Sequence, residues 1–474
     1  MGATATDPQA GPAHAEHRLT TLGSGLRIVT ERIPSVRSAA LGFWVASGSA
    51  SEREDEAGIS HLLEHMLFRG TEHFGSEEID QIFDAMGAEI NAGTDRESTS
   101  LYTRVLDGHL ERAFEVMSEM IWEPRYGELE AERQVVLEEI AMYEDDPQDL
   151  IFDVLGRAIF GSHPLGRPVI GRAEVVAGAT RELLGAFHDR RYLPRTVVIA
   201  AAGSVDHDRL VALAESSPAP TGPPAGGERA DGDGSSTTTI AAPVPEPRAR
   251  LEFLQKDTEQ YHVCLGAHGL AREDERRFAL RVLEGILGGT SSSRLFQEVR
   301  ERRGLAYAIF SFSNLYAHAG EVGLYVGTRP DNLGEALRVV AAELERLVED
   351  PASEQELVRS RENLKGRVVL GMESTGARMS RLGSSLLHGM PILSVDEMIA
   401  RIDAVELDDL RALAGELFTP ERMSVVGIGP ERERMLDALA PLSLGAREAA
   451  NGGAGRGREA VSRDARDGGE EAAP

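Results

Sequence analysis

Three residues on one short segment have the spacing of a metal site: His61, Glu64 and His65 form an H-x-x-E-H motif. The apolar residues around them recur at helical intervals, which predicts a helix over residues 57–68 with one buried stripe. At 100° per residue the three polar side chains fall together on the opposite face, within about 60° of one another. Two imidazoles one turn apart can hold one metal ion, while the carboxylate reaches a water molecule beside it. The alternative is a surface helix on which all three side chains are merely solvated.

A second amphipathic pattern predicts another helix over residues 127–145. Glu132 and Glu139, seven residues apart, project into the middle of its apolar stripe, whereas Glu138 lies on the other side. The stripe consists of Leu129, Val135, Val136, Ile140, Met142 and Tyr143. A buried carboxylate costs on the order of several kcal/mol unless a proton, a base or a metal neutralises it. Either a metal lies nearby, or Arg or Lys side chains pair with these carboxylates, or the helix is less buried than its pattern implies.

Together the two helices offer the ligand set of a catalytic zinc site. His61, His65 and Glu139 are the candidate ligands, and the fourth position stays free for water. Glu64 is the candidate general base. Glu132, one heptad before Glu139 on the same face, is expected to orient a ligand or the water. Ligand type is only a partial guide to the metal, so the ion loaded in the cell stays open.

Composition excludes several other classes of function. The chain has 474 residues and a formal net charge of −28, so a broad basic surface for nucleic acid or anionic lipid is not expected. Cys264 is the only cysteine, which rules out an intrachain disulfide and fits a reducing compartment. No signal-like or membrane-spanning apolar run is visible. We therefore expect a cytoplasmic protein that binds neither nucleic acid nor membrane.

Two polar segments divide the chain. Residues 217–247 are rich in Pro, Gly, Ser, Thr and Asp, which is typical of a flexible linker. Residues 446–474 have no periodicity and are expected to form a disordered tail, and residues 1–17 a flexible N-terminus. Two folded domains remain, over residues 18–216 and 248–445. Each alternates strands with amphipathic helices, which favours an α+β fold, an α/β sandwich of helices on a sheet.

The two domains resemble distant copies of each other. In the first, a strand over residues 41–46 leads through a charged connector into HLLEHMLFRGT; in the second, a strand over residues 261–267 leads into RVLEGILGGT. The shared order is strand, charged connector, helix and Gly-Thr. This alignment places Arg281 and Gly285 at the positions of His61 and His65. Only the first copy can then bind the metal.

The chain resembles the pitrilysin or insulinase family of inverted zincins over almost its whole length. It is most similar to the short two-domain bacterial members that are related to the beta subunit of the mitochondrial processing peptidase. The matching segments are GISHLLEHMLFRGT (58–71), GAEINAGTDRESTSLY (87–102), ERQVVLEEIAMYEDDP (132–147) and SSRLFQEVRERRGLAY (292–307). Several independent matches in one order make the resemblance specific. The long linker and the tail depart from the compact family pattern without touching a motif.

The resemblance implies a role for each matching residue. His61, His65 and Glu139 would bind one Zn²⁺ per chain, Glu64 would be the catalytic base, and Glu132 would lie beside the site. The other implied site residues are Arg300 and Tyr307, which would bind substrate carbonyls or the developing oxyanion, and Asn91 and Ala92, on an edge strand within residues 88–103 to which an extended peptide would add. Two homologous domains, each with helices on a mainly antiparallel sheet, would close around a chamber.

The implied activity is zinc-dependent endopeptidase cleavage of short or unfolded peptides, with a homodimer expected by the same analogy. One alternative is a non-catalytic assembly subunit of the same fold, which some relatives are. Inactive relatives lose the metal motif or the Arg/Tyr pair, and this chain retains both. A second alternative is a metal-dependent hydrolase of a substrate other than peptides. It would bind zinc and cleave no peptide.

Overall fold

The computed structural model describes residues 17–220, 243–350, 352–419 and 422–442. Residues 1–16 of the predicted N-terminal segment, residues 221–242 of the predicted linker and the whole predicted tail 446–474 lie outside these residues. Within the described ranges no helix has both the length and the apolar composition needed to cross a bilayer.

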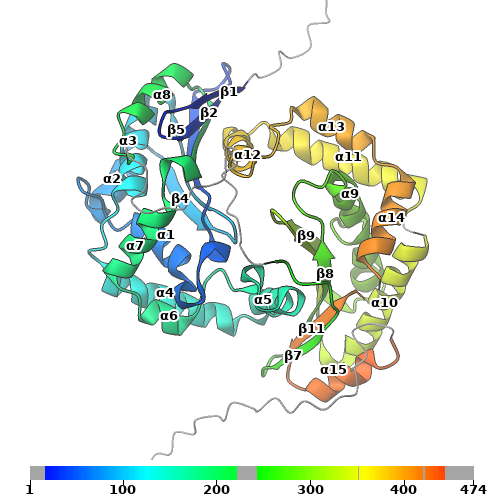
Figure 1. Cartoon of the computed structure of the whole chain (residues 1–474). Helices are drawn as coiled ribbons and strands as arrows, with labels where there is room; N and C mark the ends of the chain where they lie inside the picture. Colours follow the sequence, from blue (N-terminus) through cyan, green and yellow to red (C-terminus); the bar gives the residue numbers. More distant parts are fainter. Residues whose placement is uncertain (1–16, 221–242, 351, 420–421, 443–474) are drawn as a thin grey trace, which may run out of the picture.

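Each half of the chain builds one mixed sheet (Figure 1). Across the first sheet the order is β1 (His17–Thr21), β2 (Arg27–Arg32), β6 (Val197–Gly203), β3 (Ser38–Val45), β5 (Thr99–Leu106) and β4 (Glu89–Thr94). Across the second it is β7 (Leu251–Gln255), β11 (Ser424–Gly429), β8 (Tyr261–Gly269), β10 (Gly320–Thr328) and β9 (Ala306–Leu315). Only β2 with β6 and β7 with β11 pair in parallel. The predicted α+β class with mainly antiparallel sheets is confirmed.

The helices follow the same order in both halves. The first half contains α1 (Ile59–Leu67), α2 (Ser76–Ala85), α3 (Leu110–Trp122), α4 (Leu129–Asp145), α5 (Pro147–Phe160), α6 (Ala173–Ala177), α7 (Arg181–Arg191) and α8 (His207–Glu215). The second contains α9 (Arg277–Leu287), the π-helix η6 (Phe296–Glu301), α10 (Leu333–Glu349), α11 (Glu354–Gly371), α12 (Thr375–Leu387), α13 (Val395–Asp403), α14 (Leu407–Leu417) and α15 (Arg432–Leu439). The strand order of the second sheet repeats that of the first without β1, so the two halves share one topology.

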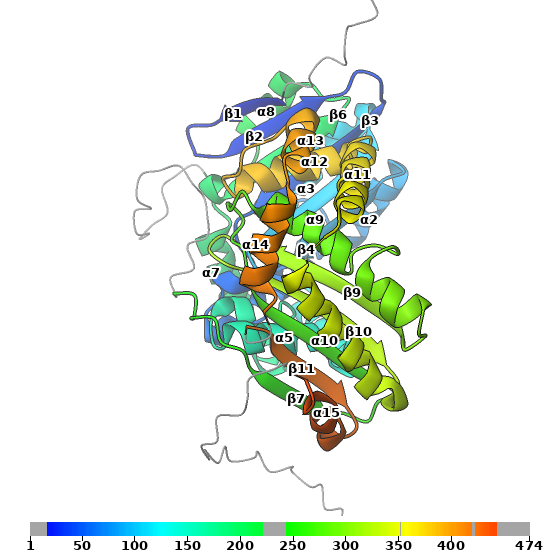
Figure 2. The ribbon, with the colours of Figure 1, turned by 90° about the vertical axis from the view of Figure 1, so that its right-hand side faces the viewer.

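Each half covers one face of its sheet with its own helices, and the other face is covered by a helix from the other half. Helix α12 packs on β6, β3 and β2 of the first sheet, and α5 packs on β8 and β11 of the second (Figures 1 and 2). The central strands are therefore buried on both faces, which explains the continuous apolar run of β6. Small residues permit the close approach, since a Cβ added at Gly42 would lie 2.6 Å from the Met379 sulfur.

Two expectations about elements need correction. The edge strand predicted within residues 88–103 is β4, which ends the sheet and carries Asn91 and Ala92, but the rest of that segment turns back and enters the second strand β5. The predicted apolar stripe of α4 is narrower than its sequence suggests, because Val135 and Met142 are exposed while Leu129, Val136 and Ile140 are buried. Helix α4 makes its main helix contacts with α1, α5 and α6, and Val135 and Met142 lie outside them.

Candidate metal centre

Helix α1 places the motif histidines on its less buried face. Its apolar residues pack into the hydrophobic core of the first half, as the helical period predicts. The helix begins at Gly58, whose φ of 104° lies in the left-handed region that favours glycine. The Glu52 carboxylate accepts hydrogen bonds from the backbone N–H groups of Gly58 (2.9 Å) and Ser60 (2.7 Å), which satisfies two donors of the first turn. Burial raises the pKa of Glu52 to about 7.

The three predicted ligands converge. His65 Nε2 lies 3.4 Å from one carboxylate oxygen of Glu139, and His61 Nε2 lies 3.8 Å from the other. One ligand atom from each residue fits within 4.8 Å of the others. Two ligands at tetrahedral positions, each about 2.0–2.1 Å from zinc, would be roughly 3.4 Å apart. The spacing of these atoms therefore fits a tetrahedral zinc ion with three protein ligands.

The charge states of the site suit a cation. Burial, with a smaller contribution from the neighbouring His65, lowers the pKa of His61 to about 4, so that imidazole is neutral at pH 7. Neutral imidazole is the form that binds metal. Burial also raises the pKa of Glu64, which makes this carboxylate a better proton acceptor than a solvated glutamate.

Glu132 is buried and contacts a candidate ligand, His65, directly. Its side chain is 4% exposed, and its Oε1 accepts a hydrogen bond of 2.8 Å from His65 Nδ1. Because an ionised carboxylate can only accept, Nδ1 carries the proton and Nε2 keeps its lone pair for the metal. The other carboxylate oxygen is paired with Arg69. Pairing with an arginine, one of the alternatives raised from the sequence, is thus realised here together with the histidine contact.

Glu139 differs from its prediction in burial. Its side chain is 46% exposed, whereas the pattern of α4 placed it in the middle of a buried stripe. The physical reason is that the stripe ends at Val136 and Ile140, and the carboxylate projects past them toward the histidines and a cavity. Because water reaches the Glu139 carboxylate, the cost of burying an unpaired charge does not apply to it.

An open cavity of about 380 Å³ adjoins the convergence point. His61, Glu64 and Glu139 line it together with residues that were not singled out from the sequence. Those residues are Gly93, Thr94, Arg96, Tyr143, Phe152, Asp153, Val169 and Ile170. They come from the end of β4, the turn after it, α4, α5 and the segment before α6, which no single sequence pattern connects. Burial raises the pKa of Asp153 to about 6 against the opposing effect of Arg96.

The predicted substrate strand reaches this cavity with its last residues. Gly93 and Thr94 line the cavity, whereas Asn91 and Ala92 lie earlier on β4 and are absent from its lining. Asn91 is exposed, and its side-chain oxygen accepts a hydrogen bond from the backbone N–H of Ala92 (2.8 Å). Because β4 is the last strand of its sheet, its outer edge is available for one more strand.

Arg300 and Tyr307 lie together, apart from the metal ligands of the same chain. Arg300 Nη1 donates to the backbone oxygen of Tyr307 (2.9 Å), and its guanidinium lies 4.3 Å from the centre of the Tyr307 ring. The Tyr307 residue is 79% exposed. Among the described residues, no hydrogen bond, ion pair or ring contact joins either side chain to His61, His65 or Glu139.

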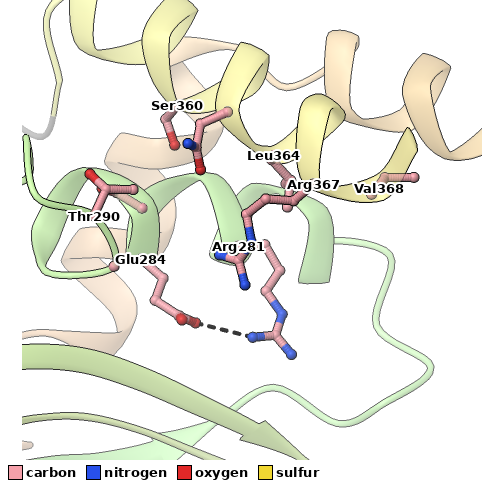
Figure 3. Close-up of a pocket in the computed structure, with 10 residues that line it drawn as sticks. Arg281, Glu284, Thr290, Ser360, Leu364, Arg367 and Val368 are labelled. Carbon is pink, nitrogen blue, oxygen red and sulfur yellow. Dashed lines mark hydrogen bonds and ion pairs between the residues drawn. The ribbon is translucent and has the colours of Figure 1, made fainter. Parts of the chain in front are cut away.

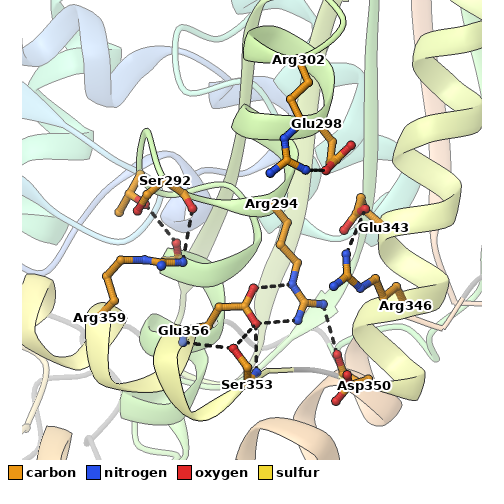
Figure 4. Close-up of polar contacts among 12 residues, drawn as sticks. Ser292, Arg294, Glu298, Arg302, Glu343, Arg346, Asp350, Ser353, Glu356 and Arg359 are labelled. Carbon is orange, nitrogen blue, oxygen red and sulfur yellow. Dashed lines mark hydrogen bonds and ion pairs between the residues drawn. The ribbon is translucent and has the colours of Figure 1, made fainter.

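A buried polar network holds the segment that carries Arg300 (Figure 4). Arg294 makes two hydrogen bonds to Glu356 at the start of α11, of 2.8 and 2.9 Å, and a third to the Asp350 carbonyl. The hydrogen bonds that Arg294 donates to Glu356, with smaller contributions from Ser353, lower the pKa of Glu356 to about 2. The network joins α11 to the residues just before η6. Arg300 lies on η6.

A second set of possible ligands lies on the surface. His73, Glu119 and Glu123 bring one ligand atom each within 4.8 Å of the others. Glu119 already accepts hydrogen bonds from the Thr71 hydroxyl (2.8 Å) and His73 Nδ1 (3.2 Å). Neither this histidine nor the two glutamates line the cavity beside His61 and Glu139.

The sequence and the fold match known proteins. Residues 27–173 match the insulinase family, peptidase family M16, and residues 178–364 match the peptidase M16 inactive domain. A protein of Streptomyces coelicolor named an uncharacterized zinc protease is 42% identical over 427 residues, which cover 89% of this chain and 91% of that protein. The chain belongs to the insulinase family. A Bacillus subtilis protein of the same description is 38% identical, over 85% of this chain and 95% of its own length.

Solved structures agree on the fold. A protease from Helicobacter pylori superposes with a TM-score of 0.82 at 23% identity, over 88% of this chain and all of the other. A peptidase M16 inactive domain from Pseudomonas fluorescens superposes with a TM-score of 0.78 at 22% identity, over 88% and 98%. These structures establish the shared fold, while the family membership and the zinc-protease relatives support a protease-type function.

Proposed function

We propose that this protein is a zinc metalloendopeptidase that hydrolyses peptide bonds in short or unfolded peptides. The observation that carries the proposal is the convergence of His61, His65 and Glu139 beside Glu64, in a cavity next to the edge strand β4. One zinc ion per chain would be held by these three ligands. When bound, zinc supplies a Lewis acid that polarises a carbonyl and acidifies water.

The chain's own residues would divide the remaining work. An extended substrate pairs its backbone with the free edge of β4, near Asn91 and Ala92, which gives affinity with little sequence preference. Glu64 accepts a proton from the attacking water and returns it to the leaving amine as the peptide bond breaks. Glu132 keeps the His65 ring in one tautomer.

Cleavage of a quenched fluorescent peptide, measured beside zinc content, tests the proposal. The wild type should cleave, and Glu64→Gln should keep about one zinc per chain and lose activity by a factor of at least about 10². His61→Ala should lose the zinc, while the control His73→Ala should keep both zinc and activity. If wild type and Glu64→Gln both bind zinc and neither cleaves any peptide, the chain is a non-catalytic subunit or acts on another substrate.

We further propose that the active form is a homodimer in which a second copy supplies Arg300 and Tyr307. The absence of described contacts to the metal ligands in the same chain and the exposure of Tyr307 support this arrangement. Their N–H and O–H groups would donate hydrogen bonds to the substrate carbonyl as negative charge develops on it.

Mixing two inactive variants tests the arrangement. His61→Ala lacks the metal and Arg300→Ala lacks the guanidinium, so a mixed dimer regains one complete site only if Arg300 acts across the interface. We expect the mixture to recover activity that neither variant has alone. A mixture no more active than its components, despite exchange of subunits, would assign Arg300 to its own chain or to no catalytic role.

A further inference from the structure

The second half contains a counterpart of the metal site. Helix α9 follows β8 and precedes β9, as α1 follows β3 and precedes β4. Helix α11 follows β10 and α10, as α4 follows β5 and α3. In both halves the two helices pack against each other, α1 on α4 and α9 on α11. Any side chains that α9 and α11 turn toward each other therefore occupy the place of the metal ligands.

Buried positions fix the alignment of α9 with α1. Four residues of α9 are buried at the spacing of four buried residues of α1. These are Val282, Leu283, Ile286 and Leu287, which match Leu62, Leu63, Met66 and Leu67. The match puts Arg281 at the position of His61, Gly285 at that of His65 and Glu284 at that of Glu64. It agrees with the alignment expected from the sequence repeat.

The same reasoning aligns α11 with α4. Three apolar positions on the inner side of each helix share one spacing. These are Leu357, Leu364 and Val368 in α11, which match Leu129, Val136 and Ile140 in α4. Ser360 then stands at the position of Glu132, and Arg367 at that of Glu139. The two histidines and two carboxylates around the metal site are thus replaced by two arginines, a serine and a glycine.

A pocket of about 360 Å³ occupies this place (Figure 3). It is lined by Arg281, Glu284, Gly285, Ser360, Asn363 and Arg367, among others. Gly285 lets the two helices approach closely at one end of the pocket, because a Cβ there would lie 2.6 Å from Ser360 Oγ. In Figure 3 Arg367 extends from α11 toward α9, and the guanidinium group of Arg281 lies below α9, beside Glu284.

The charges in the pocket do not cancel. Arg281 Nη1 lies 3.4 Å from Glu284, whose carboxylate also accepts a hydrogen bond of 2.6 Å from the Ser313 hydroxyl. Arg367 has no ion-pair or hydrogen-bond partner within the described part of the chain. Two guanidinium groups against one carboxylate leave one positive charge, in a protein whose net charge is −28. Both arginines are exposed to solvent where they line the pocket. The unpaired guanidinium of Arg367 can donate two parallel hydrogen bonds to two oxygens of one anion.

We propose that this pocket is a site for an oxyanion, either the C-terminal carboxylate of a peptide or a free small anion such as phosphate. The duplication has converted a cation site into an anion site at the same place in the fold. The inference concerns binding alone and does not rest on peptide hydrolysis.

Isothermal titration calorimetry of the full chain tests the proposal. All proteins carry Glu64→Gln, so that no peptide is consumed. The probes are inorganic phosphate, a short peptide with a free C-terminal carboxylate and the same peptide with a C-terminal amide, at one fixed ionic strength because surface charges are screened by salt. The variant is Arg281→Gln with Arg367→Gln. The control is Arg411→Gln on α14, an exposed arginine paired with Asp408.

We expect saturable binding of phosphate or the acid peptide that weakens at least about tenfold in the double variant and is unchanged in the control. Binding of the acid peptide but not of its amide identifies the peptide terminus as the ligand, and binding of phosphate alone identifies a free small anion. Either result supports the oxyanion site. No binding by the parent protein, or binding that persists unchanged in a folded double variant, overturns it.

Discussion

Replacing Glu132 tests whether its carboxylate fixes the orientation and tautomer of the His65 ring. In Glu132→Gln the side-chain oxygen can still accept from His65 Nδ1, but the negative charge between His65 and Arg69 is gone. In Glu132→Ala the acceptor is lost as well, so His65 is free to move its proton to Nε2 and turn its ring. The two substitutions therefore remove the charge first and then the hydrogen bond.

The size of each effect follows from these contacts. Loss of a carboxylate that orients a metal-binding histidine costs about 10–100-fold in metal affinity, or roughly 1.4–2.7 kcal/mol. Glu132→Gln should fall near the lower value, because a neutral hydrogen bond remains, and Glu132→Ala near the upper one. Glu132→Ala should also lower the free energy of unfolding by about 1–3 kcal/mol, since it leaves Arg69 without its buried partner.

Zinc affinity is best measured by competition with a chromophoric chelator, together with thermal unfolding of the metal-free proteins. Glu138→Gln is the matched control, because its exposed side chain lies on the same helix and points away from the site. We expect affinity to fall in the order wild type, Glu138→Gln, Glu132→Gln, Glu132→Ala, with the first two equal. A folded Glu132→Ala protein that binds zinc as tightly as the wild type would refute the orienting role.

Two further predictions concern stability, one the packing between the halves and one the Arg294–Glu356 ion pair within the second half. Gly383→Ala should lower the free energy of unfolding by about 1–3 kcal/mol, because the new Cβ would overlap the Trp44 indole ring under α12. Gly376→Ala on the same helix has only a 3.6 Å contact and should change stability by less than about 1 kcal/mol; equal losses in urea titrations would argue against this packing. Glu356→Gln should cost about 1–2 kcal/mol at pH 7, after allowance for solvent screening. Because Arg294 depresses the pKa of Glu356 to about 2, the stabilisation is present above about pH 4.5 and is lost as the pH falls toward 2. The wild type and the variant should therefore converge in urea titrations near pH 2, and a constant difference would contradict the ion pair.

The sequence predicts the two helices of the candidate site well because their apolar periodicity is a local signal. Residues 57–68 and 127–145 differ by at most two residues at either end from α1 and α4, and the helical phase brings Glu139 rather than Glu138 toward the histidines. The burial of α4 is predicted less well. A stripe of apolar residues marks the face that can be buried, but Met142 and Val135 lie beyond the area that α1, α5 and α6 cover.

The sequence does not predict that α5 covers the sheet of the second half and α12 the sheet of the first half. The reason is physical. Each helix has an ordinary amphipathic pattern, which fixes the face that is buried and not the sheet that buries it. A weak signal was present in β6, whose residues VVIAAAG are apolar at every position. Such a run requires cover on both faces of the sheet, and the small residues of β3 and β6 require a close-packed helix. Neither observation identifies a helix almost two hundred residues away.

The charge of Glu284 accounts for one of the two arginines in the pocket of the second half. Glu284 remains at the position of the general base, and Ser313 holds it inside the pocket. Without a cation, a carboxylate at position 367 would repel Glu284, whereas a guanidinium attracts it. Neutralising Glu284 needs one arginine, and Arg281 already contacts it. The second guanidinium, on Arg367, exceeds what the stability of the pocket requires, so its removal should weaken anion binding more than folding.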